Sequence, residues 1–452
     1  MLRFIGLDIG TTTISAVALN GETGEVLKTV TVNNDTAVSS GDSSRRMQNP
    51  EAIISKVCAL KDGLVKEFAP INAIGVTGQM HGVLYLDANG KAVSPLYTWQ
   101  DASGNLPYGQ STYAEYLSEK TGYPLASGYG LVTDFVNRDK GCVPDTAVTL
   151  CTIHDYAVMA LTGRTRPLMH SSDAASLGCF DTEKNCFDAA AIESIGLSAG
   201  FLPEVVCGAE TAGYDTNGIP VAAAIGDNQA SVIGSVNGKS CALVNIGTGS
   251  QVSIITNKHA VLNDCELRPL NSGLYLLVGA PLCGGRSFAL LHSFFKECAS
   301  LFGGDTNNIY PVMDAIAAEN ISEHTLKVDT RFCGTRKNPE IKGGIYNITD
   351  TNLTPSQLTK GFLYGMAEEL YSLYRCMLPH CSGTVTEIAA SGNAIRKSPV
   401  LKAYLEEMFG FKLNIPLHRE EAAFGAAVFA AAASGHYRDI FDAQKNLVHY
   451  IL

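Results

Sequence analysis

The chain has 452 residues, 46% of them hydrophobic and 44 of them glycine, and a formal net charge of −11 at pH 7. A chain of this length and composition predicts an α/β protein of two or more domains, because one ordinary core does not grow so large. Lysine and arginine form no long runs, which excludes the basic footprint of a nucleic-acid-binding protein, so an anionic substrate must be held by local donors.

The first predicted element, residues 4–19, is a pair of strands joined by a tight turn. Its first strand is almost wholly apolar, which is typical of a strand buried on both faces. Gly10 allows the turn and a close approach by a ligand, and the amides and hydroxyls of Thr11 and Thr12 can point at one anion. Asp8, at the strand end, can hold a magnesium ion that a phosphate also touches. A hairpin without any ligand is the alternative interpretation of this stretch alone.

Polar and aromatic side chains follow the next buried strand, residues 73–77. Open α/β sheets bind ligands at such strand ends, and the candidate sugar-binding residues here are Gln79, Met80 and His81. The segment 97–101 contains the only tryptophan, whose ring can cover the C–H surface of a sugar while neighbouring polar groups bind hydroxyls. The candidates in that segment are Trp99, Gln100 and Asp101. Each alone would be an ordinary structural residue, and their combination with the phosphate hairpin favours a sugar site.

Helices and loops are expected between these segments and the middle of the chain. Pro50 begins one helix, Tyr113 begins another, and residues 150–161 predict a third with an apolar face. Within that third helix, His154 and Asp155 are expected to cap or to bond locally, and they are not counted as catalytic. Residues 167–180 are polar and predict a loop.

A boundary between two halves is expected near residues 218–220, before a small-residue strand and a helix that begins around Asp227. Asp227 is a good N-cap residue. A carboxylate at a helix N-terminus also stays ionised and rigidly held, as a base that accepts a sugar hydroxyl proton must be. The two roles are compatible, and both stay open here.

Residues 242–255 repeat the pattern of the first hairpin, with Asn245 in the place of Asp8 and Gly247-Thr248 after it. Such internal self-similarity predicts a duplicated domain with a phosphate chain held between the two copies. Two further segments, 283–286 and 391–394, bring glycine to the point where a strand gives way to a helix. A glycine pair at such a point can approach a nucleotide closely.

These segments together resemble the FGGY carbohydrate kinases over nearly the whole chain, within the superfamily that includes actin and the heat-shock ATPases. The matching segments are 8–12, 226–229, 245–249, 391–394 and 423–427. The resemblance implies an α/β fold of two duplicated actin-like, ribonuclease H-like domains, with mixed sheets flanked by helices and a cleft between them. It implies a sugar-binding domain at residues 1–220 and a nucleotide-binding domain at residues 221–452.

The resemblance also implies a role for each candidate residue, with ATP and Mg²⁺ as cofactors. ATP is expected to be bound by Gly10, Thr11, Thr12, Gly247, Thr248, Gly285, Gly392 and Asn393. The ketose is expected to be bound by Gln79, Met80, His81, Trp99, Gln100, Asp101 and Asp227. Asp8 is expected to hold the metal, and Asp227 to act as general base.

Within the family, residues 79–82 are similar to the xylulokinase and sedoheptulokinase branch, which acts on ketoses. Finer matches to the sedoheptulokinases lie at 98–101, 152–156, 166–169, 173–176 and 391–394. The resemblance therefore implies phosphorylation of sedoheptulose to sedoheptulose 7-phosphate, with xylulose as the alternative substrate. Many xylulokinases carry Asn where Gln100 stands, which weakens xylulose, and Ser391 replaces the first of the usual adenosine-site glycines, which leaves the nucleotide preference open.

Two rival functions are an actin-like or chaperone ATPase switch and a sugar-binding regulator without catalysis. The switch has no need of the histidine and tryptophan segments, and intact Asp8 and Asp227 argue against the regulator. A monomer or a homodimer is expected.

The 13 cysteines form no close metal-binding pair, and they predict reduced thiols packed as small apolar groups. The first strand follows Met1-Leu2-Arg3 directly, which leaves no room for a signal peptide, and the apolar run 422–433 is far shorter than the roughly 20 residues that span a bilayer. A cytoplasmic enzyme without a membrane partner is therefore expected.

Overall fold

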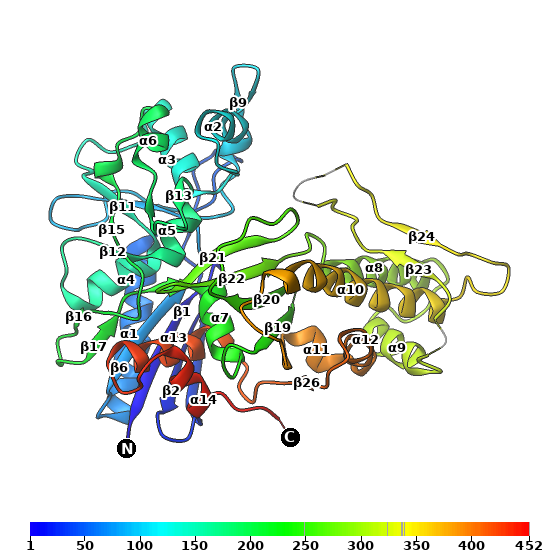
Figure 1. Cartoon of the computed structure of the whole chain (residues 1–452). Helices are drawn as coiled ribbons and strands as arrows, with labels where there is room; N and C mark the ends of the chain where they lie inside the picture. The colour runs from blue at the N-terminus through cyan, green and yellow to red at the C-terminus, as the bar shows by residue number, and fades with distance from the viewer. Residues whose placement is uncertain (248, 323, 336–337, 339, 452) are drawn as a thin grey trace. The chain divides into compact units, whose positions relative to one another are not determined.

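The computed structural model describes residues 1–247, 249–322, 324–335, 338 and 340–451, and its contacts divide the chain into two units (Figure 1). The first unit comprises Met1–Gly238, Arg268–Leu274 and Glu420–His449. The second comprises Lys239–Leu267, Tyr275–Arg419 and the residues after His449. The sequence placed a single boundary between residues 220 and 221, whereas the contacts also assign residues 221–238, 268–274 and 420–449 to the first unit.

The main sheet of the first unit has the strand order β16-β17-β6-β1-β2-β3, and β18 also pairs with β6. The strands are β1 (Arg3–Ile9), β2 (Thr13–Asn20), β3 (Val26–Asn33), β6 (Ala73–Gly78), β16 (Thr211–Tyr214), β17 (Pro220–Ala222) and β18 (Ile225–Gly226). β1 runs antiparallel to β2 and parallel to β6, and β18 also runs parallel to β6. The carboxyl ends of β1, β6 and β18 therefore meet at one edge of the sheet.

The second large sheet has the order β21-β22-β20-β19-β25-β26. Its strands are β19 (Cys241–Ile246), β20 (Ser250–Thr256), β21 (Glu266–Asn271), β22 (Leu274–Gly279), β25 (Glu387–Ser391) and β26 (Leu413–Asn414). β19 is antiparallel to β20, β20 is antiparallel to β22, and β19 is parallel to β25. This repeats the pairing of β1, β2, β3 and β6 and confirms the predicted duplication of a mixed sheet.

Apolar residues of α1 (Pro50–Phe68) and α4 (Ile153–Thr162) form one core with the inner residues of β1, β2 and β6. Asn49 caps α1, and Pro50 occupies its first position, as expected for a helix start. α13 (Glu421–Ala433) packs against β1, β6 and α7 (Asp227–Ser235) (Figure 1).

Backbone-to-backbone packing explains why α13 consists of small residues. A Cβ at Gly6 or Gly75 would lie within 1.9 Å of a carbonyl oxygen of α13, and a Cβ at Gly425 would lie 1.8 Å from the carbonyl oxygen of Ala230. The small residues of α13 therefore allow this helix to pack closely on the sheet and on α7. Residues 421–433 contribute to the core of the first unit. This core is therefore completed by a segment that follows most of the second unit in the sequence.

Smaller elements complete the two units. In the first unit they are β4 (Ala37–Val38), β5 (Met47–Gln48), β7 (Leu84–Leu86), β8 (Leu96–Tyr97), β9 (Pro107–Tyr108), β10 (Ser111–Thr112), α2 (Tyr113–Thr121), α3 (Gly130–Asp139), β11 (Thr149–Cys151), β12 (Leu168–His170), α5 (Ser171–Leu177), β13 (Phe180–Asp181), β14 (Cys186–Phe187), α6 (Ala189–Ser194), β15 (Glu204–Val206) and α14 (Ile440–Leu447). In the second they are α8 (Gly285–Leu301), α9 (Ile309–Ala318), β23 (Lys327–Asp329), β24 (Gly344–Tyr346), α10 (Pro355–Met377), α11 (Asn393–Lys397) and α12 (Pro399–Phe409). Among the described residues, no helix combines the length and apolar character that a membrane span requires.

Two sequence predictions between residues 149 and 180 were wrong. Residues 149–151 form β11, paired with β7, and the helix begins only at Ile153, after the N-cap Thr152. Residues 168–177, predicted as loop, form β12 and α5. β12 and α5 are short and almost completely buried, so a pattern of exposed polar and buried apolar positions does not mark them in the sequence.

Candidate active site

Two carboxylates expected in the chemistry lie at the edge where β1, β6 and β18 end. Asp8 pairs with Thr77 of β6, and Gly226 of β18 pairs with Gly78 at the end of β6. Asp227 follows Gly226 directly. The strand pairing thus brings together the predicted metal ligand and the predicted base within the first unit.

Asp227 does not cap α7, contrary to one expectation from the sequence. Gly226 occupies the N-cap position and Asp227 is the first residue inside the helix, with no side-chain capping bond. Because β18 ends at Gly226 and passes straight into α7, the helix begins one residue earlier than a capping Asp227 requires. The carboxylate of Asp227 therefore lies at the positive end of α7 without serving as its cap.

Burial dominates the electrostatics of both carboxyl groups. It raises the pKa of Asp227 to about 6, against the opposing effects of His154, the Asn228 backbone and Arg268. Burial also raises the pKa of Asp8 to about 7, and the negative charges of Asp227 and Glu420 add to that shift while His154 opposes it. The edge of the sheet is thus crowded with acidic groups.

Asp8 fits the role of a metal ligand. Its Oδ1 atom is enclosed, yet it has no hydrogen-bond partner among the residues that the structure describes. A carboxylate oxygen is the donor that Mg²⁺ prefers, either directly or through a bound water molecule. The enclosed, unpartnered oxygen is therefore compatible with a cation at this strand end.

Trp99, Thr11 and Gln79 form one hydrogen-bonded chain. The indole Nε1 of Trp99 donates to the hydroxyl of Thr11 at 2.9 Å, and that hydroxyl donates to Oε1 of Gln79 at 3.2 Å. Nε2 of Gln79 donates to Oε1 of Gln48 at 2.8 Å, and Nε2 of Gln48 donates to the Thr11 carbonyl at 2.9 Å. The sequence assigned Thr11 to phosphate and the other two candidates to sugar, and the structure connects the two groups directly through the Thr11 hydroxyl. Gln48, which sequence reasoning missed, adds a second link from Gln79 to the Thr11 carbonyl.

An open pocket of about 310 Å³ adjoins this chain of hydrogen bonds. Its lining residues are Thr11, Thr12, Asn33, Asn34, Asp35, Ala37, Arg46, Met47, Gln48, Thr98 and Gln100. That volume lies at the lower end of the range typical of small-molecule sites. Trp99 has 48% of its surface exposed, so its indole combines an open face with a fixed N–H.

Met80 and His81 lie close to the same strand end. A Cβ at Gly226 would lie 2.7 Å from the sulfur of Met80, so that side chain packs beside the residue before Asp227. His81 has a φ of 72°, its backbone N–H donates to Ser176 Oγ at 3.1 Å, and its Nδ1 lies 2.7 Å from the Ser176 carbonyl oxygen. Its ring stacks on Tyr129 with 4.6 Å between centroids. His81 is thus held in one orientation.

Gln100 and Asp101 differ sharply in exposure. Gln100 is exposed and lines the pocket, whereas Asp101 is buried. The Asp101 carboxylate accepts hydrogen bonds from the backbone N–H and hydroxyl of Ser103 and lies 3.5 Å from Arg45. These partners anchor the loop that carries Trp99, and a direct contact of Asp101 with sugar stays a prediction.

The second unit gathers several of its candidate nucleotide residues at the end of β19. A Cβ at Gly392 would lie 2.4 Å from the carbonyl oxygen of Ile246, and a Cβ at Gly284 would lie 2.6 Å from the Ser250 amide nitrogen. Asn393 begins α11 and Gly285 begins α8. The N–H of Gly247 donates to the Gly249 carbonyl at 2.8 Å. Thr248, the remaining candidate, lies outside the described residues.

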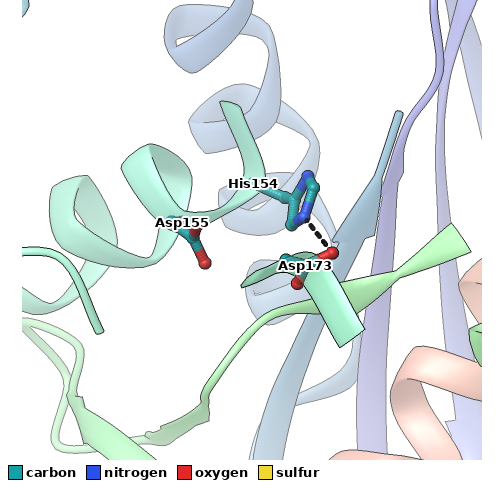
Figure 2. A group of neighbouring side chains, drawn as sticks. All are labelled: His154, Asp155 and Asp173. Carbon is teal, nitrogen blue, oxygen red and sulfur yellow. Dashed lines mark ion pairs between the residues drawn. The ribbon is translucent and has the colours of Figure 1, made fainter. Parts of the chain in front are cut away.

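A buried group that was not predicted from the sequence lies beside the two carboxylates. Nε2 of His154 is 3.0 Å from Oδ1 of Asp173, and neither side chain is exposed (Figure 2). Asp155 lies next to them. A ring nitrogen of His154 and one carboxylate oxygen each of Asp155 and Asp173 all lie within 4.8 Å of one another. Asp155 forms a capping box with Thr152, which confirms its local role. His154 instead contacts a different helix. The sequence hinted at this group only through the segments 152–156 and 173–176, which were both noted as family matches.

Comparisons with known proteins give a family model, sequence relatives and solved structures that this chain resembles. Residues 3–234 match the model of the FGGY family of carbohydrate kinases, N-terminal domain. The chain is similar to sedoheptulokinases of Mus musculus, at 28% identity, and of Homo sapiens, at 26%, each over 94% of this chain and 96% of the relative. A solved xylulose kinase from Rhodospirillum rubrum shares its fold, with a TM-score of 0.84 and 20% identity over all of this chain and 93% of the other.

Proposed function

Since this chain belongs to the FGGY family of carbohydrate kinases and is an ATP-dependent sugar phosphotransferase, we propose that it phosphorylates the terminal hydroxyl of a ketose, with sedoheptulose as the first candidate and sedoheptulose 7-phosphate as the product. The observation that carries the proposal is the hydrogen-bonded chain from Trp99 through Thr11 to Gln79, next to Asp8 and Asp227. It supports a sugar site continuous with a phosphate site.

The choice of sedoheptulose depends on the relatives. Both sedoheptulokinases align along nearly the whole chain, and the Trp99-Gln100-Asp101 and Asp173 segments are among the matches found in the sequence. Xylulose is the second candidate, because the segment Gln79-Met80-His81-Gly82 is similar to both branches of the family. Gln100, which replaces the Asn of many xylulokinases, favours the longer ketose.

Asp227 is the proposed general base. Its carboxylate accepts the proton of the terminal hydroxyl while that oxygen forms a bond to the γ-phosphorus of ATP, and the bond from this phosphorus to the bridging oxygen breaks to release ADP. Trp99 covers the apolar face of the sugar, and Gln79, Met80, His81, Gln100 and Asp101 are proposed to orient it. A magnesium ion held by Asp8 would neutralise phosphate charge when bound.

The nucleotide is proposed to bind the glycine-rich turns. Gly10, Thr11 and Thr12 offer donors to its phosphates in the first unit, and Gly247, Gly285, Gly392 and Asn393 offer close backbone approach in the second, with Thr248 retained as a candidate. A Cβ atom at Gly284 would collide with Ser250, and a Cβ atom at Gly392 would collide with Ile246. Glycine at these two positions therefore supports close packing of the backbone segments there.

A panel of sugars tests the substrate. ADP release is measured with sedoheptulose, xylulose, ribulose, fructose and glycerol at saturating ATP and Mg²⁺. We expect kcat/KM for sedoheptulose to exceed that for xylulose by at least about tenfold, the discrimination that one or two recognised groups provide. A reversed ratio selects the xylulose candidate, and ATP hydrolysis that no sugar stimulates contradicts the proposed function.

A further inference from the structure

The imidazole of His154 packs closely against Gly78, where an added side chain would crowd it. A Cβ at Gly78 would lie 3.2 Å from Nδ1 of His154. Gly78 is the residue of β6 that pairs with Ile9 of β1 on one side and with Gly226 of β18 on the other. The ring therefore lies against β6, the middle strand of the three. Of the two outer strands, β1 carries Asp8 and β18 leads directly into Asp227.

On its other side the ring contacts Asp173 of α5, with Nε2 and Oδ1 3.0 Å apart and both residues at 0% exposure (Figure 2). α5 is also tied to the base, because the N–H of Gly226 donates to Ser172 Oγ at 3.1 Å. A buried carboxylate without a countercharge is unfavourable. A nearby positive charge therefore stabilises the buried carboxylates of Asp173, Asp155 and Asp227. His154 is the basic residue of this group.

We propose that His154 is a positioning residue for the kinase reaction: Asp173 holds its imidazole in the protonated form, and the resulting fixed positive charge keeps the carboxylate of Asp227 ionised inside its buried setting at neutral pH. The inference rests on the proposed role of Asp227 as general base. His154 itself touches neither sugar nor phosphate in this scheme.

The charges around both residues agree with the proposal. Burial lowers the pKa of His154, but Asp173, Asp155 and Asp227 together raise it to about 9. Burial raises the pKa of Asp227 to about 6, and among the charges that face it His154 and Arg268 lower the pKa while Asp173 raises it. Asp8 and Asp227 also repel each other. Loss of the imidazolium therefore leaves Asp227 with a higher proton affinity.

Replacement of the charge tests the proposal through the pH profile. In His154→Gln, we expect the acidic limb of kcat/KM to move up by about one pH unit or more, which is a tenfold loss at a pH below the limb. Activity should recover towards that of the wild type above the new limb, and the KM for the sugar should change little. The double variant His154→Gln/Asp173→Asn replaces the ion pair by two neutral amides and covers the case in which the single variant does not fold. It should show the same direction of shift.

His170 provides a matched control, because it is equally buried in the same unit but contacts the hydroxyl of Ser172, with Nδ1 and Oγ 2.9 Å apart. Burial lowers its pKa to about 4, so it carries no charge at neutral pH. His170→Asn keeps a residue type suited to the helix cap that His170 forms. The acidic limb should stay in place in this variant. A loss of activity in His154→Gln that is equal at every pH overturns the proposal.

A measurement without turnover separates this inference from the proposed function. In wild-type protein with ¹⁵N-labelled histidine, the signal that disappears in His154→Gln should show an imidazolium between pH 6 and pH 8. A neutral ring at pH 7, or a stoichiometric divalent ion that is lost with the substitution, overturns the inference. Failure of every sugar in the panel contradicts the proposed function, and the NMR signal still decides the charge of His154.

Discussion

Asp227 lies at the first position of α7, where burial raises its pKa to about 6. A carboxylic acid accepts no proton, so we expect kcat/KM of the wild type to fall tenfold per unit as the pH falls below about 6. Asp227→Asn keeps the size of the side chain but removes the base, and kcat should fall by roughly 10²–10⁴-fold while the KM for the sugar changes little. Steady-state kinetics across pH 5 to 9 measure both effects.

The matched control for this substitution is Asp350→Asn, at an exposed residue of the second unit. It should leave both kcat and the pH profile unchanged. An Asp227→Asn enzyme with near-normal kcat would remove Asp227 from the role of base, and sugar binding that vanishes with the substitution would make it a binding residue instead.

The sequence predicted some residues at this edge of the first sheet and missed others, for a physical reason. Asp8 lies near the end of a buried strand, and Gln79 and Asp227 each follow one directly. The carboxyl ends of parallel strands lie at one edge of a sheet, so sequence position alone indicated that these residues are neighbours. Gln48 and the pair His154–Asp173 reach the site by packing between elements far apart in the chain. No local pattern reports such a contact, and His154 accordingly appeared to be a residue that bonds within its own helix.

At the scale of elements, close contact between α13 and α7 holds the helix that begins with Asp227. A Cβ at Gly425 would lie 1.8 Å from the Ala230 carbonyl oxygen and 2.8 Å from the Gly234 amide nitrogen. Neither backbone atom can rotate away, so Gly425→Ala should lower the free energy of unfolding by about 1–3 kcal/mol, as for overpacked cores. Urea denaturation followed by circular dichroism measures the change.

Gly63 is the matched control, because it is an exposed glycine inside α1 with no heavy atom within 4 Å of its Cβ position. Gly63→Ala should raise the free energy of unfolding by about 0.5–1 kcal/mol, since alanine loses less backbone entropy in a helix. Equal stability of Gly425→Ala and the wild type would mean that α13 moves freely away from α7.

Elements with a strong pattern were predicted nearly to their ends. The hairpin β1–β2 follows its apolar pattern, and α1 and α2 begin at Pro50 and Tyr113, the start residues that the sequence predicted. β12 and α5 were missed because complete burial erases that periodicity. A single domain boundary was predicted at residue 220 because a linear inspection of the chain does not show that α13 returns to the first sheet.

At the scale of the whole molecule, each unit carries its own set of candidate ligand-binding residues, and this separation can be tested with one ligand at a time. A ligand that binds only the native state stabilises it by about 2.7 kcal/mol at a ligand concentration of a hundred times Kd. The amide hydrogens of the segments that the ligand contacts then exchange more slowly with solvent.

Sedoheptulose alone should protect residues 79–82 and 97–101, and a non-hydrolysable ATP analogue alone should protect residues 284–286 and 391–393. The turn at residues 10–12 should respond to both ligands, because Thr11 offers a phosphate donor and also bonds Trp99 and Gln79. A sugar that fails in the kinetic panel is the control and should protect neither set. Protection of the second-unit glycines by sedoheptulose, with residues 97–101 unchanged, would reverse the assignment of sugar and nucleotide to the two units.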